Sequence, residues 1–391
     1  MRQSRTKLTI LHDTKEVERS ILVQVIHSRM ERDEAADSLL ELGRLAETAG
    51  FEVVCHVEQH RDKPDGGTMV GAGKLRELEA IIAHSGANTV VFDNELSAIQ
   101  AHNLWKALGV RILDRTEIIL EIFARRARSS EAKLQVELAQ LQFQLKRIPV
   151  TESQQRFKGR ANVRGPGESH LQLRNEPLRR RINELKKKLE IVQSRQTSRD
   201  IAKRKWPIVS LVGYTNAGKS TLLNALSDSS TFVDDMLFAT LDTKTSKVWL
   251  SPSRQILMTD TVGFIRNLPH GLIASFKSTL DVASHADLLL VLVDSQYPAV
   301  EDHIEVCRST LEEIGARDVP RLIVLNKCDE GDGGEAHERL LKRYPLAVSI
   351  SAKTGYGLDD LKNAIIRQLT EHCELWRLPP SVYGQKPTNP S

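Results

Sequence analysis

Short apolar runs alternate with longer polar stretches along the first part of the chain. The apolar runs are SILVQVI from Ser20, FEVVCHV from Phe51, NTVVF from Asn88 and VRILD from Val110. The polar stretches between them have the composition of helices, and Gly50 is placed to end the first helix. This alternation of four strands and three helices predicts a small, mostly parallel α/β subdomain, which we assign to residues 1–115.

The alternation returns after Pro207. Four runs, IVSLV, RQILM, DLLLVLV and RLIVLN, are short and almost continuously apolar. Such runs are typical of strands that are covered on both faces. The pattern predicts an α/β domain with a doubly wound, mostly parallel sheet at residues 206–371, followed by a Pro-rich C-terminal tail at 372–391 that is ordered only in part.

The segment between these two patterns has the period of a helix. Apolar side chains recur at spacings of three and four in two stripes, Leu134, Leu138, Leu141, Leu145 and Ile148, then Leu178, Ile182, Leu185, Leu189 and Val192. Two helices with such stripes would pair antiparallel across a loop near 150–176. The sequence therefore predicts a long helical hairpin at residues 116–205.

The basic residues are concentrated in this hairpin, although the whole chain carries a net charge of only +4. Between Glu121 and Lys205 there are 22 Lys and Arg against 9 Asp and Glu, a balance of +13. The loop carries Arg156, Lys158, Arg160 and Arg164 among Gly and Pro residues. A charge run is most often a solvated surface, but a basic loop on a stiff helical arm favours a polyanionic partner, nucleic acid above all.

Composition excludes several classes of protein. No apolar run approaches the ~18 residues of a membrane span, and the amino terminus lacks the apolar segment of a secretory signal. The four cysteines, Cys55, Cys307, Cys328 and Cys373, show neither C-x-x-C spacing nor a His cluster, so no disulfide framework or zinc site is expected. We expect a cytoplasmic protein with reduced thiols.

GYTNAGKS, at 213–220, lies between a predicted strand and the predicted helix STLLNALS. Glycines in such a loop let successive backbone N–H groups curl around phosphates at a helix N-terminus. The Lys219 ammonium would reach the β- and γ-phosphates, and the Ser220 hydroxyl would ligate Mg²⁺. The predicted phosphate-binding residues are Gly213, Tyr214, Thr215, Asn216, Ala217, Gly218, Lys219, Ser220 and Thr221.

DTVGF, from Asp260, has the offset from this loop that a nucleotide switch requires. Asp260 would hold Mg²⁺ through its water shell, and the Gly263 N–H would donate to the γ-phosphate. In the intervening FATLDTKT, the Thr240 hydroxyl would join the metal only while a γ-phosphate is present; a plain polar loop before the strand SKVWL is an equal alternative. Lys219, Thr240 and Gly263 are the predicted catalytic residues.

Two further motifs predict recognition of guanine. In NKCD, Asp329 can accept two hydrogen bonds from the guanine edge, while Asn326 and Lys327 brace the loop and cover the base. SAKTG, with Ser351, Ala352 and Lys353, offers the Ala352 N–H to guanine O6. These motifs select GTP over ATP.

The N-terminal subdomain contains a second glycine-rich stretch, MVGAGKLREL from Met69. It lacks the spacing and the hydroxyl of a phosphate loop, so it predicts a glycine turn before a helix.

The runs LFATLD, DTVGFIRNLPH, DRTEIILEIFARRA, KLQVELAQL and RGPGE resemble those of the HflX family of ribosome-associated GTPases, within the translation-factor class of P-loop GTPases. The similarity covers about Leu22 to Leu378. It implies a protein that binds GTP and GDP, docks on the large ribosomal subunit, is stimulated by it to hydrolyse GTP, and splits or rescues ribosomes under stress. The hairpin loop would point toward the peptidyl-transferase centre, with Arg156, Lys158, Arg160 and Arg164 as ribosome-binding residues. We expect a monomer.

The chain departs from the family pattern in two places. After RGPGE it continues with SHLQLRNEPLRRR, where the family usually has a Thr-Gln-Leu-Glu-Thr-Asp-like segment. The sequence also stops soon after WRLPP, which indicates a divergent member that lacks most of the family's further C-terminal domain.

Phe264 stands where Ras-like switches carry the Gln that orients the attacking water, and it has no hydrogen-bonding group. The resemblance to the family implies a retracted Phe264, and we expect slow intrinsic turnover that rises when the large subunit docks. Asn216 either suits the tight turn or marks the use of K⁺ in place of an arginine finger.

Two other interpretations of the whole protein stay open. One is a nucleotide-gated RNA-binding module with negligible turnover. The other is an ATP-using remodeller that acts through the N-terminal subdomain.

Overall fold

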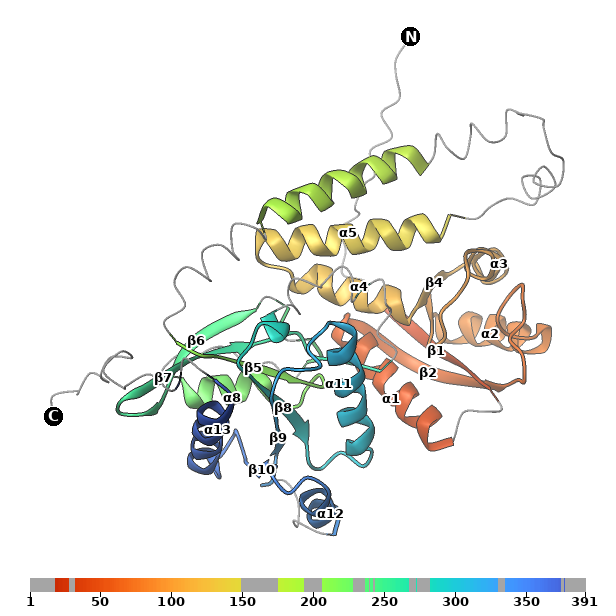
Figure 1. Ribbon diagram of the computed structural model, residues 1–391. Helices are drawn as coiled ribbons and strands as arrows, with labels where there is room; N and C mark the ends of the chain where they lie inside the picture. Colours follow the sequence, from red (N-terminus) through yellow and green to blue (C-terminus); the bar gives the residue numbers. More distant parts are fainter. Residues whose placement is uncertain are drawn as a thin grey trace. The chain divides into compact units, whose positions relative to one another are not determined.

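The computed structural model describes residues 18–27, 32–148, 175–192, 206–227, 236–238, 240–241, 243–266, 272, 282–329, 335–373 and 376. The chain divides into two compact units, of which the first ends at Arg115 and the second begins at Thr116 (Figure 1). The predicted hairpin loop with Arg156, Lys158, Arg160 and Arg164, and nearly all of the C-terminal tail, lie outside the described residues. None of the described helices is long and apolar enough to cross a bilayer.

The first unit contains a four-stranded parallel sheet in the order β2-β1-β3-β4. Its elements are β1 (Glu18–Ile26), α1 (Arg32–Thr48), β2 (Phe51–His60), α2 (Ala72–Ser85), β3 (Thr89–Phe92), α3 (Ala98–Leu108) and β4 (Arg111–Asp114). Gly50, with φ of 87°, lies in the turn that follows α1. The predicted parallel α/β pattern is confirmed. The GAGK stretch forms the start of α2 after Gly71, as the failed phosphate-loop spacing predicted.

A buried ion cluster holds the polar edge of this first unit. Nη1 of Arg115 lies 2.6 Å from Oδ1 of Asp93, and Nη2 pairs with the Glu41 carboxylate. The Ser38 hydroxyl and the Gln24 amide donate to the other oxygen of Asp93 at 2.6 and 3.1 Å. The Arg115 side chain is 4% exposed, so two carboxylates depend on one guanidinium in a region that water does not reach.

Arg115→Ala is therefore expected to destabilise the first unit by about 3–5 kcal/mol, because it removes the buried guanidinium that pairs with both Asp93 and Glu41. Hydrogen exchange of the β1 and β3 amides measures that free energy of opening. The control is Arg111→Ala, since the pair of Arg111 with Glu18 is 43% exposed on both sides and should cost about 1 kcal/mol or less. Equal losses in the two variants would contradict the importance of the cluster.

The second unit begins with α4 (Arg115–Arg126) and α5 (Ser130–Lys146), followed by a helix at 175–192. The last two helices pack through a cluster drawn from the predicted apolar stripes, namely Leu138, Ile182, Leu185 and Leu189, with Leu134, Leu141 and Leu145 at its border. Arg181 adds an ion pair to Glu137 at 2.7 Å. The helical period of the sequence thus identified the residues that join these helices.

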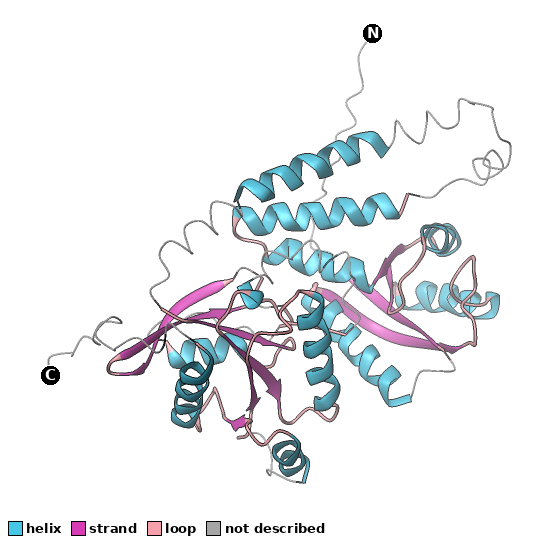
Figure 2. Cartoon of the chain, viewed as in Figure 1, coloured by secondary structure: helices cyan, strands magenta, loops and turns pink. Residues whose placement is uncertain are grey.

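The rest of the second unit is a six-stranded sheet in the order β10-β9-β8-β5-β7-β6, with helices on both faces (Figure 2). The strands are β5 (Ile208–Gly213), β6 (Lys244–Ser251), β7 (Arg254–Asp260), β8 (Leu288–Asp294), β9 (Arg321–Asn326) and β10 (Val348–Ser349). The helices are α8 (Lys219–Leu226), α11 (Val300–Glu313), α12 (Glu335–Arg343) and α13 (Leu358–His372). Only β6 runs antiparallel to its neighbour among these described pairings, so the predicted mostly parallel sheet is confirmed.

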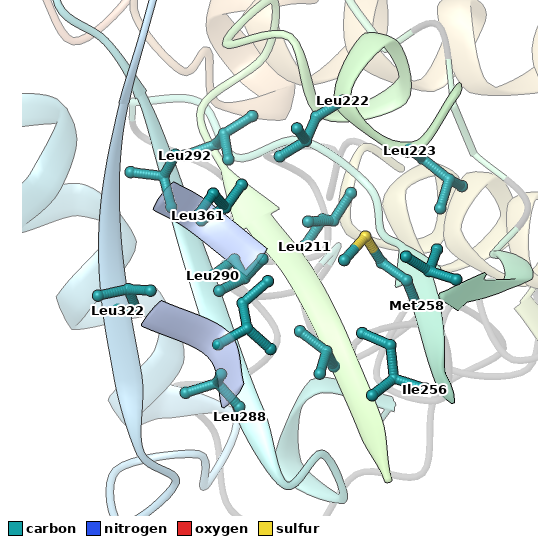
Figure 3. Close-up of a cluster of buried hydrophobic side chains, with 14 of the residues drawn as sticks. Leu211, Leu222, Leu223, Ile256, Met258, Leu288, Leu290, Leu292, Leu322 and Leu361 are labelled. Carbon is teal, nitrogen blue, oxygen red and sulfur yellow. The ribbon is translucent and has the colours of Figure 1, made fainter. Parts of the chain in front are cut away.

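Both faces of this sheet are apolar, as the continuous runs predicted. Along β8, Leu288, Leu290 and Leu292 join one core cluster, which α8 and α13 cover (Figure 3). The alternate residues Leu289, Val291 and Val293 join a second cluster on the other face, which α11 covers. The parallel strands β5, β7, β8 and β9 therefore share a carboxyl edge at which their following loops meet, and β5 lies where the strand order reverses.

Candidate functional site

The loop after β5 approaches its neighbours so closely that only glycine fits at its two ends. A Cβ on Gly213 would lie 2.2 Å from the Leu292 carbonyl oxygen, and one on Gly218 would lie 2.2 Å from the Asn326 amide nitrogen. Gly218 also has φ of 93°, a conformation that other residues rarely adopt. α8 begins directly afterwards at Lys219, so the backbone N–H groups of the loop converge at a helix N-terminus.

Lys219 lies folded back onto this loop. Its Nζ donates to the carbonyl oxygens of Gly213 at 3.1 Å and Tyr214 at 2.8 Å. Burial lowers the pKa of Lys219, and the charge of Asp260 opposes that shift. The ammonium is therefore held at the loop by groups that phosphate oxygens can replace as partners.

The structure brings together the three predicted metal ligands. Oδ2 of Asp260 lies 2.6 Å from the Ser220 hydroxyl and 3.0 Å from the Thr240 hydroxyl, and the two hydroxyls lie 2.8 Å apart. Oδ1 of Asp260 is buried without a hydrogen-bond partner within the described part of the chain, and burial raises the pKa of this carboxyl. The Asp260 carboxylate and the hydroxyls of Ser220 and Thr240 are adjacent hard oxygen donors, the type of ligand that Mg²⁺ prefers. The Oδ1 atom of Asp260 is also available to accept a further bond.

The DTVGF segment runs parallel to the start of the phosphate loop, with Phe264 bridged to Tyr214. The Phe264 N–H donates to the Gly213 carbonyl at 3.0 Å, and the Thr215 N–H donates to the Phe264 carbonyl at 2.8 Å. A Cβ on Gly263 would lie 2.8 Å from Cγ2 of Thr215 and 3.0 Å from Nζ of Lys219. Glycine is therefore required where this segment meets the loop.

The Phe264 side chain is 1% exposed and packs in the cluster under α11 with Val212 and Leu289. It is a core residue, retracted from the polar site as expected. The side chain takes no part in the polar site, and only the backbone of this segment lies there.

The loop that carries Thr240 is anchored on α4. Phe238 has φ of 53°, is buried, and packs edge-to-face on Phe123 with 4.8 Å between ring centroids. Arg126 of α4 adds a contact from Nη2 to Sδ of Met236 at 3.2 Å. The sequence predicted Thr240 but missed this anchor, because no spacing relates two phenylalanines that lie so far apart in the chain.

The NKCD and SAKTG motifs meet at the Asn326 side chain. Its Nδ2 donates to the Ala217 carbonyl at 2.8 Å, and its Oδ1 accepts from the Ala352 N–H at 2.9 Å. The Ala352 N–H that we assigned to guanine O6 is thus engaged by Asn326, and a contact with the base would have to share or replace that bond. Asn326 ties the phosphate loop to both base-recognition loops.

The remaining base-recognition residues lie around this junction. Lys327, with φ of 64°, pairs through Nζ with Asp294 at 2.8 Å, a partner that the motif alone did not indicate. Asp329 is exposed, and hydrogen bonding from Ser351 lowers the pKa of its carboxyl. Lys353 is exposed, whereas Asn216 and Thr221 lie in the phosphate loop and the first turn of α8.

Asn326→Ala is expected to lower the affinity for GDP about 10- to 100-fold, which corresponds to about 1.4–2.8 kcal/mol, because the phosphate loop and the base-recognition loops lose the side chain that joins them. Asn326→Asp keeps the acceptor for the Ala352 N–H but turns a buried carboxylate oxygen toward the Ala217 carbonyl, so it should lose at least as much affinity. Asn363→Ala, at an exposed position of α13, is the control. Titration with a fluorescent GDP analogue measures the affinities, and equal affinities in all three variants would refute the bridging role.

Comparison with known proteins agrees with this geometry. Three family models match the chain: "GTP-binding GTPase N-terminal" at 36–124, "GTP-binding GTPase Middle Region" at 126–203 and "50S ribosome-binding GTPase" at 208–327. The GTPase HflX of Caldanaerobacter subterraneus subsp. tengcongensis is 42% identical over 92% of this chain and 82% of its own length. The GTPase HflX of Escherichia coli K12 is 39% identical over 91% of this chain and 85% of its own length.

A crystal structure of a GTP-binding protein from the archaeon Sulfolobus solfataricus in complex with GDP also matches. It is 26% identical, covers 90% of this chain and 99% of that chain, and has a TM-score of 0.46. The fold and the carboxyl-edge loops define a P-loop GTPase, an enzyme that hydrolyses GTP. The extent of the sequence match then decides the family: the chain belongs to the HflX GTPases.

Proposed function

We propose that this GTPase acts on the large ribosomal subunit, which stimulates it to hydrolyse GTP to GDP and phosphate, and that it splits or rescues stalled ribosomes under stress. The observation that carries the proposal is the buried Phe264 beside an otherwise assembled site. A GTPase with no side chain to orient the attacking water at this position needs that help from elsewhere, and a docked partner is the simplest source.

The identity of the partner is supported by charge and by family. The segment from Glu121 to Lys205 carries the +13 balance, and two of its helices form the packed pair described above. The family model over the GTPase domain is described as a 50S ribosome-binding GTPase. We therefore propose that Arg156, Lys158, Arg160 and Arg164 contact ribosomal RNA. We propose domains at residues 1–115, 116–205 and 206–371, followed by the C-terminal tail at 372–391.

Each site residue has a role in this proposal. Lys219 moves from the loop carbonyls to the β- and γ-phosphates, and the Gly263 N–H donates to the γ-phosphate. Ser220 and Thr240 would ligate Mg²⁺ directly and Asp260 through water, and the ion would neutralise phosphate charge. Asp329 accepts from the guanine edge, with Lys327 and Lys353 beside the base.

K⁺ as a further cofactor rests on Asn216 alone. Asn216 is exposed and has φ of 61°, a conformation that asparagine tolerates better than most residues. The turn therefore accounts for the residue type, and a K⁺ site remains a proposal that the comparison of K⁺ and Na⁺ buffers decides.

Purified large subunits are expected to raise the rate of GTP turnover at least 10-fold, because docking supplies the missing orientation of the water. Replacing Arg156, Lys158, Arg160 and Arg164 with Gln should weaken subunit binding and flatten its salt dependence, with the rate of the free protein unchanged. The assay is release of phosphate in K⁺ buffer, repeated in Na⁺. Intact binding without any stimulation would refute activation by the subunit, and equal rates in the two buffers would remove K⁺.

Asp329→Asn is expected to weaken GTP binding by a factor of about 100 or more, since hydrogen bonds to a charged group contribute about 1.5–3 kcal/mol each. The new amide should favour xanthosine triphosphate, because xanthine has a carbonyl where guanine has an amino group. Competition between the two nucleotides measures the switch. Asp359→Asn, which removes a 93% exposed charge at the start of α13, should change neither affinity.

A further inference from the structure

Three aromatic rings, two of them buried, form a stack beside the phosphate loop. The Tyr214 ring lies parallel to the His303 ring, with 3.6 Å between centroids and 7° between planes. On its other side His303 stacks on Tyr297 at 4.1 Å and 20°. Tyr214 and His303 are each 5% exposed. We predicted Tyr214 only as part of the phosphate loop, but its side chain packs on α11.

The Tyr214 hydroxyl reaches the segment that follows Gly263. It accepts a hydrogen bond from the Arg266 N–H at 2.7 Å. The Arg266 guanidinium pairs with Asp302, the neighbour of His303 on α11, at 2.8 Å. Both the backbone and the side chain of Arg266 are thus held by α11 and by the ring that stacks on it.

This contact bears on hydrolysis because of where the segment lies. The Phe264 side chain is buried, so the backbone around Gly263 is what the segment presents beside Lys219. Two backbone hydrogen bonds fix that backbone at Phe264, and the Tyr214 hydroxyl fixes it two residues later. A tyrosine has few rotatable bonds, and the stack restricts them further, so its hydroxyl is a rigid anchor.

The phosphate-loop pattern itself does not require an aromatic side chain at this position, which is variable in the motif. The tyrosine therefore needs a reason outside phosphate binding. A core-packing role would explain the ring but not the hydroxyl, which is placed on one backbone N–H of the adjacent segment.

We propose that Tyr214 and His303 are positioning residues for GTP hydrolysis: the His303 stack orients Tyr214, whose hydroxyl holds the Gly263–Arg266 backbone in the register that hydrolysis requires. This backbone anchor takes over part of the positioning that a polar side chain at position 264 would otherwise supply. The role is separate from nucleotide binding, because the hydroxyl contacts the segment after Gly263 and not the phosphate loop.

The test uses the full chain without ribosomes, so its outcome does not depend on the proposed partner. Tyr214→Phe keeps the ring and removes only the hydroxyl. We expect kcat for GTP hydrolysis to fall at least 5- to 10-fold, with the affinities for GTP and GDP within 2-fold of the original protein. Hydrogen exchange at the Arg266 amide should become faster, which reports the loss of this one contact.

Two further variants separate positioning from packing. Tyr297→Phe removes the hydroxyl of the other tyrosine in the stack and leaves the contact between Tyr214 and the Arg266 N–H in place, so its kcat should stay within 2-fold. His303→Ala should lower kcat as Tyr214→Phe does, and His303→Phe should restore most of it by restoring a stacking ring. A kcat of Tyr214→Phe within 2-fold of the original, or a parallel loss of nucleotide affinity and melting temperature, would overturn the proposal.

Discussion

The nucleotide site depends on three glycines, each of which lies so close to a neighbouring segment that a residue with a Cβ atom would clash. Gly213 meets the Leu292 carbonyl, Gly218 meets the Asn326 amide, and Gly263 meets Thr215. Each contact joins the phosphate loop to a different neighbouring strand or its following loop. Because the strands are parallel and both faces of the sheet are packed, these loops have little freedom to separate, and the site keeps its geometry from the sheet beneath it.

The buried Phe264 changes what the rest of the site must do. A buried phenylalanine at this position adds to the packing of the core, but it has no group that could orient a water molecule. What remains near Lys219 is backbone, and backbone is positioned by its neighbours. The hydrogen bonds to Gly213 and Thr215 and the Tyr214 hydroxyl then acquire an importance that they would lack beside a catalytic side chain.

The contact between Phe238 and Phe123 connects the nucleotide loops to the helical part of the second unit. The Thr240 hydroxyl contacts Ser220 and Asp260. Phe238 lies two residues before Thr240, and Phe123 lies on α4, the helix that leads into α5. A phenylalanine at positive φ is uncommon, and burial against a second ring offsets its local cost.

The sequence by itself determined the elements and the chemistry. Continuous apolar runs specified strands covered on both faces, the spacing of three and four specified the helices that contain Leu138 and Leu185, and the motifs named Lys219, Ser220, Asp260 and Asn326. These are local or periodic signals, because each depends on neighbours within a few residues. Only the tertiary structure decided which core cluster Phe264 joins, that Asn326 occupies the Ala352 N–H, and that Tyr214 stacks on His303 and binds Arg266. Those contacts join residues from separate elements, and their partners are chosen by sheet order and packing, which no local pattern records.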